Sequence, residues 1–94
     1  MDGRQAVDPP LRRVLVVDVS RLQRRVLATL LGGWGFEVHE ADGGEEALAL
    51  CHSVNPDLVI SDWMMPGMDG ISFCKAFRQI PREHYGYFIL LTSK

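Results

Sequence analysis

The 94-residue sequence predicts an α/β fold in which an open parallel sheet carries helices on both faces. Four predicted strands alternate with three segments of helical periodicity, and the strands are residues 14–17, 36–41, 58–61 and 87–91. Segments 14–17 and 58–61 lack the polar alternation of a half-buried strand, which is typical of strands covered on both faces. Strands that alternate with helices in this way pair in parallel through right-handed crossovers.

Composition and charge exclude several classes of protein. The chain has 12 acidic and 10 basic residues, so no cationic field favours nucleic acid as its partner. Its 47% hydrophobic and 23% charged content predicts one globular domain, at residues 11–94, after a flexible polar arm at residues 1–10. No apolar run approaches the roughly 20 residues that cross a bilayer, and the polar start is unlike a secretory signal, so we expect a cytoplasmic location. Two cysteines, Cys51 and Cys74, are expected to be reduced packing residues.

The first helix is predicted from Ser20 onward, and the glycines of segment 32–35 end it. Its expected apolar face consists of Leu22, Val26, Leu27, Leu30, Leu31 and Trp34. The basic side chains of the same helix occupy other positions: Arg21, Arg24 and Arg25. They are expected to form a solvated face, with docking of an acidic partner as the alternative.

The polar residues of segment 36–41 predict a strand near a sheet edge. Asp42 and Glu45 match a capping box, which predicts that the second helix opens there and continues to Val54. The third helix is predicted at about residues 70–78, with Ile71, Cys74 and Phe77 facing inward and Pro81 preventing its extension.

Three polar side chains follow predicted strands at their carboxyl ends: Asp18, Asp62 and Thr92. Parallel α/β sheets bind ligands at this edge, so we expect these groups to converge. Two adjacent carboxylates repel each other unless a cation lies between them, which favours Mg²⁺ and phosphoryl chemistry. A carboxylate can itself accept a phosphoryl group. The alternative is that Asp18 and Asp62 only cap the helices that follow them.

Residues 14–18, together with Asp62-Trp63-Met64-Met65-Pro66-Gly67-Met68-Asp69-Gly70, resemble the receiver domain of two-component response regulators. Segment 90–93 is similar to the fourth strand and switch hydroxyl of that family, and the resemblance extends over about residues 13–94. It implies a flavodoxin-like sheet with strand order 2-1-3-4-5. The family is one of signalling domains, so the resemblance implies self-phosphorylation and self-dephosphorylation at most, not an enzyme.

The resemblance also implies roles for individual residues. Asp62 would be the phosphoacceptor, and Asp18, Asp62 and the backbone carbonyl of Met64 would bind Mg²⁺. Thr92 would be the hydroxyl that turns toward the phosphoryl group. The donor would be a phosphohistidine on a sensor histidine kinase or a phosphotransfer protein.

The chain departs from the family pattern at two places. Val19 stands where the family usually has a second acidic residue, so we expect weaker Mg²⁺ binding, unless the metal retains extra waters there. The sequence also stops after the fourth strand, without the fourth helix, fifth strand, fifth helix and active-site lysine, and Lys94 lies on the wrong loop to replace that lysine. An open strand edge and bare apolar surface then favour a homodimer, or a longer parent protein.

Two other functions compete with this interpretation. A haloacid dehalogenase phosphatase needs an acidic residue two positions after Asp18, where this chain has Ser20. A degenerate receiver that works as an interaction or dimerisation module without phosphorylation requires only the fold. Val19 favours this second interpretation, whereas Asp62 and Thr92 oppose it.

Overall fold

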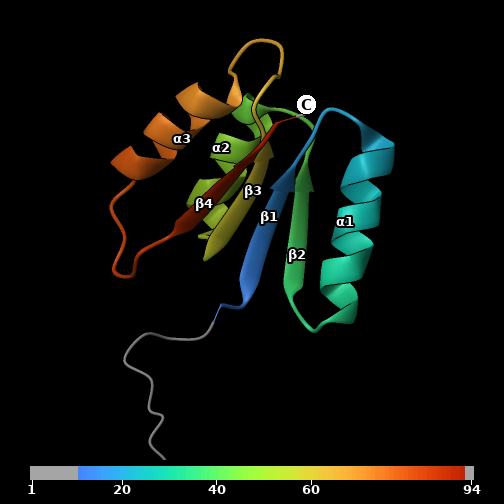
Figure 1. The fold of residues 1–94 in the computed structure, drawn as a ribbon. Helices are drawn as coiled ribbons and strands as arrows, with labels where there is room; N and C mark the ends of the chain where they lie inside the picture. Colours follow the sequence, from blue (N-terminus) through green and yellow to red (C-terminus); the bar gives the residue numbers. More distant parts are fainter. Residues whose placement is uncertain (1–10, 93–94) are drawn as a thin grey trace, which may run out of the picture.

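The computed structural model describes residues 11–92, so the predicted arm at residues 1–10 lies outside the described part. Its elements are β1 (Arg13–Val17), α1 (Arg21–Gly33), β2 (Glu37–Ala41), α2 (Gly44–Val54), β3 (Leu58–Asp62), α3 (Gly70–Gln79) and β4 (Tyr87–Leu91) (Figure 1). The four strands form one parallel sheet in the order β2-β1-β3-β4. This confirms the α/β fold class and the flavodoxin-like order as far as the chain extends. No helix among the described residues is long and apolar enough to span a bilayer.

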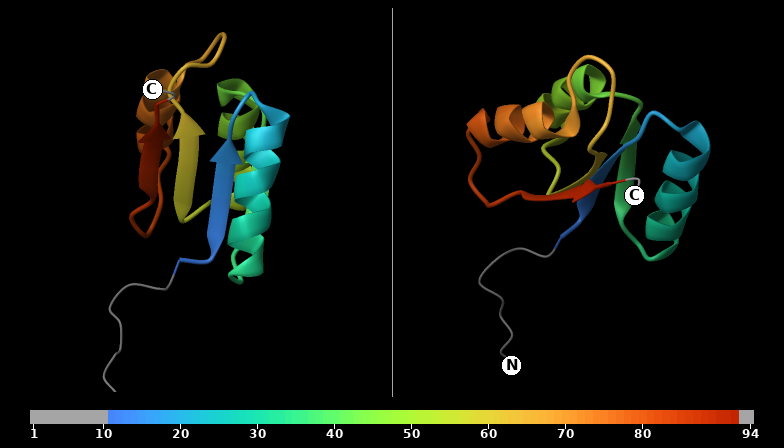
Figure 2. Two further views of the ribbon diagram at one scale, coloured as in Figure 1. Left: turned by 45° about the vertical axis from the view of Figure 1, so that its right-hand side comes forward. Right: turned by 45° about the horizontal axis from the view of Figure 1, so that its top comes forward.

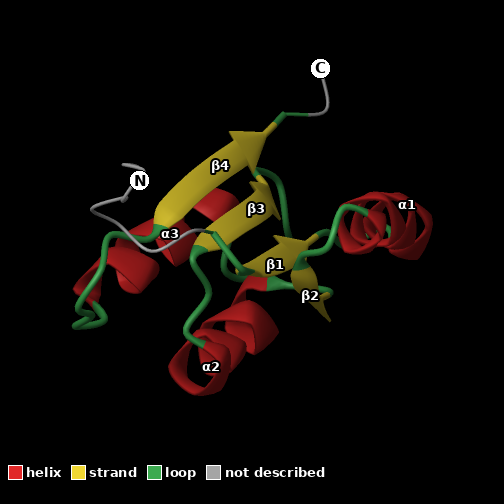
Figure 3. Cartoon of the chain, turned by 90° about the horizontal axis from the view of Figure 1, so that it is seen from below, coloured by secondary structure: helices red, strands yellow, loops and turns green. Residues whose placement is uncertain are grey.

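Helices cover the two faces of the sheet unequally. Figure 3 shows α1 alone on one side, with α2 and α3 on the other. The α2 and α3 side holds the larger core, where Leu15, Val17 and Val59 of the central strands meet Phe73 and Phe77. The α1 side holds a smaller cluster. Its members are Val14, Val16, Leu31 and Ile60.

Helix α1 begins and ends where the sequence predicts, but its apolar face is only partly buried. Ser20 caps it by accepting the Gln23 N–H at 3.3 Å, and Gly35 has a positive φ of 98° just beyond its end. Ala28 and Leu31 are buried. Four side chains of the predicted apolar face are exposed: Leu22, Val26, Leu30 and Trp34.

The basic side chains of α1 are also placed differently from the prediction. The guanidinium of Arg24 pairs with Glu40 of β2 at 3.1 Å, and Arg25 pairs with the same carboxylate. Arg24 therefore links α1 to β2 instead of facing solvent, because β2 contains Glu40 as an acidic partner.

The capping box predicted at Asp42 and Glu45 is wrong by one residue. Helix α2 has Gly43 as its N-cap, and the Glu46 carboxylate accepts the Asp42 N–H at 2.9 Å. Glu45 instead reaches across to the segment after β3, where it accepts the Met68 N–H at 3.2 Å. This tertiary contact competes with the local one.

The buried face of α3 is also rotated from the prediction. Phe77 is buried as expected, but Phe73 and Gly70 accompany it, whereas Ile71 and Cys74 are only half-buried at the flank. The ring of Phe73 contacts Phe88 of β4 edge-on, with ring centroids 5.2 Å apart. The spacing of these residues permits either face, and the aromatic contact with β4 selects the observed one.

Strand β4 forms the edge of the sheet and is covered on one face only. Figure 2 shows it at the end of the sheet away from α1. Phe88 packs into the core beneath α3, whereas Tyr87, Ile89 and Leu91 face the α1 side and are 41 to 47% exposed. The register pairs Ile89 with Ile60, which belongs to the cluster under α1.

Candidate functional site

Asp18 follows β1 directly and is held in place by its own backbone. Its N–H donates to the Ala41 carbonyl at 3.2 Å, and its carbonyl accepts the Arg24 guanidinium at 2.7 Å. Its carboxylate oxygen Oδ1 accepts the Ser20 N–H at 2.8 Å, and the residue is only 7% exposed. The Ser20 N–H thus fixes the orientation of the Asp18 carboxyl group. The N-caps are Ser20 for α1 and Asp69 for α3, so the alternative that Asp18 and Asp62 only cap the following helices is wrong.

Asp62 is the last residue of β3 and lies beside Asp18. Burial raises the pKa of the Asp62 carboxyl to about 6, and a hydrogen bond with Asp18 and the negative charge of Asp18 act in the same direction. A hydrogen bond from the Val19 N–H opposes them. The two carboxyl groups therefore lie together, as expected. In the absence of a cation, the negative charge of one disfavours ionisation of the other.

A cavity of about 250 Å³ lies over the two carboxyl groups. It is lined by Asp18, Val19, Ser20, Gln23, Asp62, Met64 and Leu91. The site is at the carboxyl ends of β1, β3 and β4, at the top of Figure 1. Thr92 is the next residue after Leu91 at this edge and is exposed.

Sequence reasoning missed Ser20 and Gln23 as cavity-lining residues. Both belong to the turn that leads from Asp18 into α1, so the signal available was their distance of two and five residues from Asp18. Only the phase of the helix relative to the sheet decides which side chain of the first turn faces the cavity.

The segment between β3 and α3 is anchored at both ends. The Trp63 N–H donates to the Leu91 carbonyl at 3.0 Å, and the Gly70 N–H donates to the Trp63 carbonyl at 2.8 Å. A Cβ on Gly70 would lie 2.3 Å from the Asp62 carbonyl oxygen, so only glycine permits this close approach. Asp69 caps α3 by accepting the Ser72 N–H at 2.8 Å. The backbone around Asp62 is therefore closely constrained.

The donor set suits a hard divalent cation but is small. Two neighbouring carboxyl groups suit Mg²⁺, which retains several waters and needs few protein ligands, and Met64 lines the same cavity. No group of three or more His, Cys, Asp or Glu residues that could hold a metal occurs within residues 11–92. Val19 lines the cavity and is 47% exposed, at the position where the family usually has a further acidic residue.

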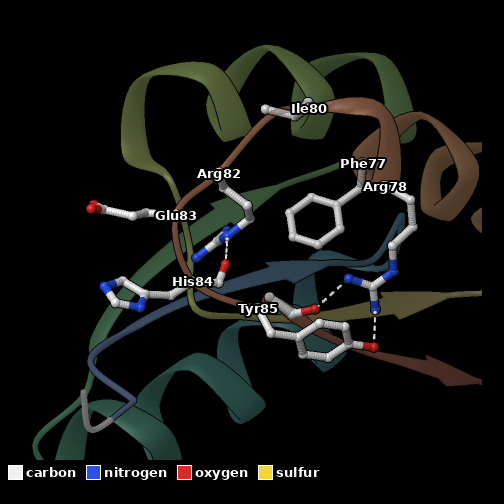
Figure 4. A pocket seen from close by; sticks show the side chains of 8 residues that line it. Phe77, Arg78, Ile80, Arg82, Glu83, His84 and Tyr85 are labelled. Atoms are coloured by element: carbon white, nitrogen blue, oxygen red, sulfur yellow. Dashed lines mark hydrogen bonds between the residues drawn. The ribbon is translucent and has the colours of Figure 1, made fainter. Parts of the chain in front are cut away.

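A second hollow, of about 350 Å³, lies between α3 and β4, near the amino end of β4 (Figure 4). Arg78 donates to the Gly86 carbonyl and to the Tyr85 hydroxyl, and its guanidinium lies 4.6 Å from the Tyr85 ring centroid. Arg82 donates to the carbonyls of His84 and Pro56. These arginines bind loop carbonyls, which indicates a structural role.

Comparison with known proteins agrees with this geometry. The family model for the response regulator receiver domain matches residues 14–94. The chain is 37% identical over 83 residues to the chemotaxis protein CheY of Pseudomonas aeruginosa, covering 87% of this chain and 67% of CheY. It is 40% identical to the transcriptional regulatory protein ResD of Bacillus subtilis, of which it covers 33%.

A solved structure of chemotaxis protein CheY4 of Vibrio cholerae superposes with a TM-score of 0.84 at 35% identity. The match covers 90% of this chain and 71% of CheY4. The family model, the sequence relatives and the shared fold lead to one conclusion: the chain belongs to the response regulator receiver domain family.

Proposed function

We propose that Asp62 accepts a phosphoryl group from a phosphohistidine of a sensor histidine kinase or phosphotransfer protein, in a reaction that requires Mg²⁺. The observation that supports the proposal is the position of Asp62 beside the buried Asp18, in a cavity at the carboxyl edge of the sheet. The chain is a receiver domain, and its kinase partner and a cytoplasmic location are parts of this proposal.

In the proposed reaction, an Asp62 carboxylate oxygen attacks phosphorus, and the bond between phosphorus and the donor imidazole nitrogen breaks. Asp18 and the Met64 carbonyl would hold Mg²⁺ beside Asp62. The ion would neutralise charge on the carboxylates and on the transferring phosphoryl oxygens. Thr92, at the end of β4, would turn toward the new phosphoryl group.

Phosphorylation with a small donor tests the proposal directly. The protein incubated with acetyl phosphate and Mg²⁺ should gain the mass of one phosphoryl group, and Asp62→Asn should abolish the gain. Asp69→Asn is the matched control, because Asp69 lies seven residues away and caps α3. A degenerate receiver predicts no gain in the unmodified protein, and that result would overturn the proposal.

We also propose that the protein self-associates through its uncovered apolar face. This face consists of Leu22, Val26 and Leu30 on α1 and of Tyr87 and Ile89 on β4, with exposures of 45 to 75%. The β4 strand beside it lies at the edge of the sheet. In a two-fold dimer, α1 of each copy would cover the bare side of β4 in the other.

Light scattering coupled to size-exclusion chromatography measures this self-association. We expect a dimer for the unmodified protein, and a shift to monomer with Val26→Glu, which places a charge on the face without changing the core. Gln79→Glu, at the exposed end of α3 on the opposite side of the sheet, should remain dimeric. If the unmodified protein stayed monomeric even at high protein concentration, the proposed self-association would be refuted.

A further inference from the structure

The side chain of Gln23 lines the site with an amide that its own helix does not use. Ser20 and Gln23 have the spacing of a capping box, in which the Gln23 side chain would accept the Ser20 N–H. Only half of the box forms, with the Ser20 hydroxyl accepting the Gln23 N–H. The Ser20 N–H donates instead to Asp18 at 2.8 Å. Asp18 therefore takes the local partner of the Gln23 amide.

The Gln23 amide lies on the same cavity as the two carboxyl groups. It lines this cavity together with Asp18, Asp62 and Val19. Within the described part of the chain, its side chain forms no hydrogen bond with another residue. Arg24 and Arg25, its neighbours, are turned toward Glu40 on β2. Gln23 therefore offers a free amide oxygen, a hydrogen-bond acceptor, at the cavity. The same cavity has Val19 where the family usually has a second acidic residue.

We propose that the Gln23 amide oxygen accepts a hydrogen bond from a water of the hydrated Mg²⁺ ion, and that it partly replaces the carboxylate missing at position 19. This inference rests on the proposed function, because it assumes that Asp18 and Asp62 bind the ion. Gln23 is a positioning residue in this arrangement. A neutral amide oxygen orients metal-bound water without the charge of a carboxylate, and such outer contacts contribute about 10- to 100-fold to metal affinity.

Mg²⁺ titration followed by tryptophan fluorescence tests this role without measuring phosphorylation. Trp63 adjoins Asp62 and reports on the site, and Trp34→Phe removes the other tryptophan, at the far end of α1. In this background, Gln23→Leu should raise the Mg²⁺ dissociation constant about tenfold. Gln23→Glu should lower it. Gln79→Leu makes the same chemical change at the exposed end of α3 and should leave the constant unchanged.

The Val19→Asp background makes the test specific for compensation. If Gln23 substitutes for the absent carboxylate, Gln23→Leu should change the Mg²⁺ affinity less than twofold once Asp occupies position 19. Equal effects of Gln23→Leu in both backgrounds would overturn the compensation. Circular dichroism verifies that each variant retains the fold.

The remaining outcomes separate this inference from the proposed function. Unchanged affinity in Gln23→Leu, with Mg²⁺ bound normally by the unmodified protein, would refute the role of Gln23 and leave the Asp18 and Asp62 site intact. Binding only after Val19→Asp would show that Gln23 does not compensate. Absence of Mg²⁺ binding in every variant would refute both the inference and the metal site on which the proposed function depends.

Discussion

Strand β3 has an aspartate at each end, and the two carboxyl groups have opposite surroundings. Asp57, just before the strand, accepts the N–H groups of Arg12 and Arg13 at 2.9 Å each and lies 3.8 Å from the Arg82 guanidinium. Burial opposes ionisation of Asp57, but these backbone hydrogen bonds and basic charges outweigh it and lower the pKa. Asp62, at the other end, meets a second carboxyl group, and its pKa is raised to about 6.

The comparison shows where this small domain concentrates unfavourable charge. At the amino edge of the sheet, Asp57 joins β1, β3 and the segment after α3, and each of its two carboxylate oxygens has a partner. At the carboxyl edge, Asp18 and Asp62 lack a positive partner among the residues that line the cavity. A bound cation relieves this repulsion, and so does replacement of Asp62 by a neutral residue. Cation binding and the free energy of unfolding are therefore coupled at this end of the strand only.

Gly70→Ala should have the largest effect on stability, because the new side chain would disturb the backbone next to Asp62, at the end of β3 that carries the site. The new Cβ would lie 2.3 Å from the Asp62 carbonyl oxygen and 2.9 Å from the Trp63 Cα, neither of which can move freely. We expect a loss of about 3 kcal/mol in the free energy of unfolding, measured with urea.

Gly33→Ala is the matched control, since a Cβ there meets no atom within 4 Å. It should change stability by less than about 1 kcal/mol. A Gly70→Ala protein as stable as this control would show that the segment after β3 adjusts easily, and that the backbone around Asp62 is not constrained.

Asp57→Ala should cost about 2 kcal/mol at pH 7, because two backbone N–H groups lose a charged acceptor. The pKa of Asp57 is lowered in the folded state, so its contribution is present above pH 4 and is lost as the pH falls through the folded-state value. Urea unfolding should therefore show a difference between the two proteins that shrinks toward pH 3. A difference independent of pH would assign the loss to packing instead of charge.

The sequence predicted the acidic pair because strand ends are a strong signal. Asp18 and Asp62 each terminate an apolar run, and parallel strands bring their carboxyl ends to one edge. The partners of these side chains were less accessible. Gln23 faces the site because of the helical phase of α1, and Asp57 gains its N–H donors from residues 44 and 45 positions away.

Burial was the least predictable property, because it depends on what lies opposite each side chain. Leu22 and Leu31 have the same chemistry on the same helix, yet Leu22 is 75% exposed and Leu31 is 7% exposed. Leu31 packs over β1 with Val14 and Val16, whereas Leu22 belongs to neither buried cluster. A periodic apolar pattern predicts which side chains can be buried, and the side chains opposite them decide which ones are.

Asp62→Asn should have the smallest effect on stability and the opposite sign from Asp57→Ala. The pKa of Asp62 is about 6 in the folded protein and near its usual 3.8 when unfolded, so the folded state loses stability as the pH rises from 4 to 6. The Asn variant carries no such charge. In metal-free buffer at pH 8 it should be more stable than the unmodified protein by about 1 kcal/mol, allowing for solvent screening.

Urea unfolding at pH 8 and pH 4 measures this effect, and the gap should vanish at pH 4, where the Asp62 carboxyl is largely neutral in the folded protein. Added Mg²⁺ should narrow the gap at pH 8 by stabilising only the protein that retains both carboxylates. Asp57→Asn is the control and should lower stability at pH 8, because its carboxylate is already satisfied. If Asp62→Asn were also destabilising at pH 8, the two ends of β3 would be alike, and repulsion between Asp18 and Asp62 would not explain the chemistry of the site.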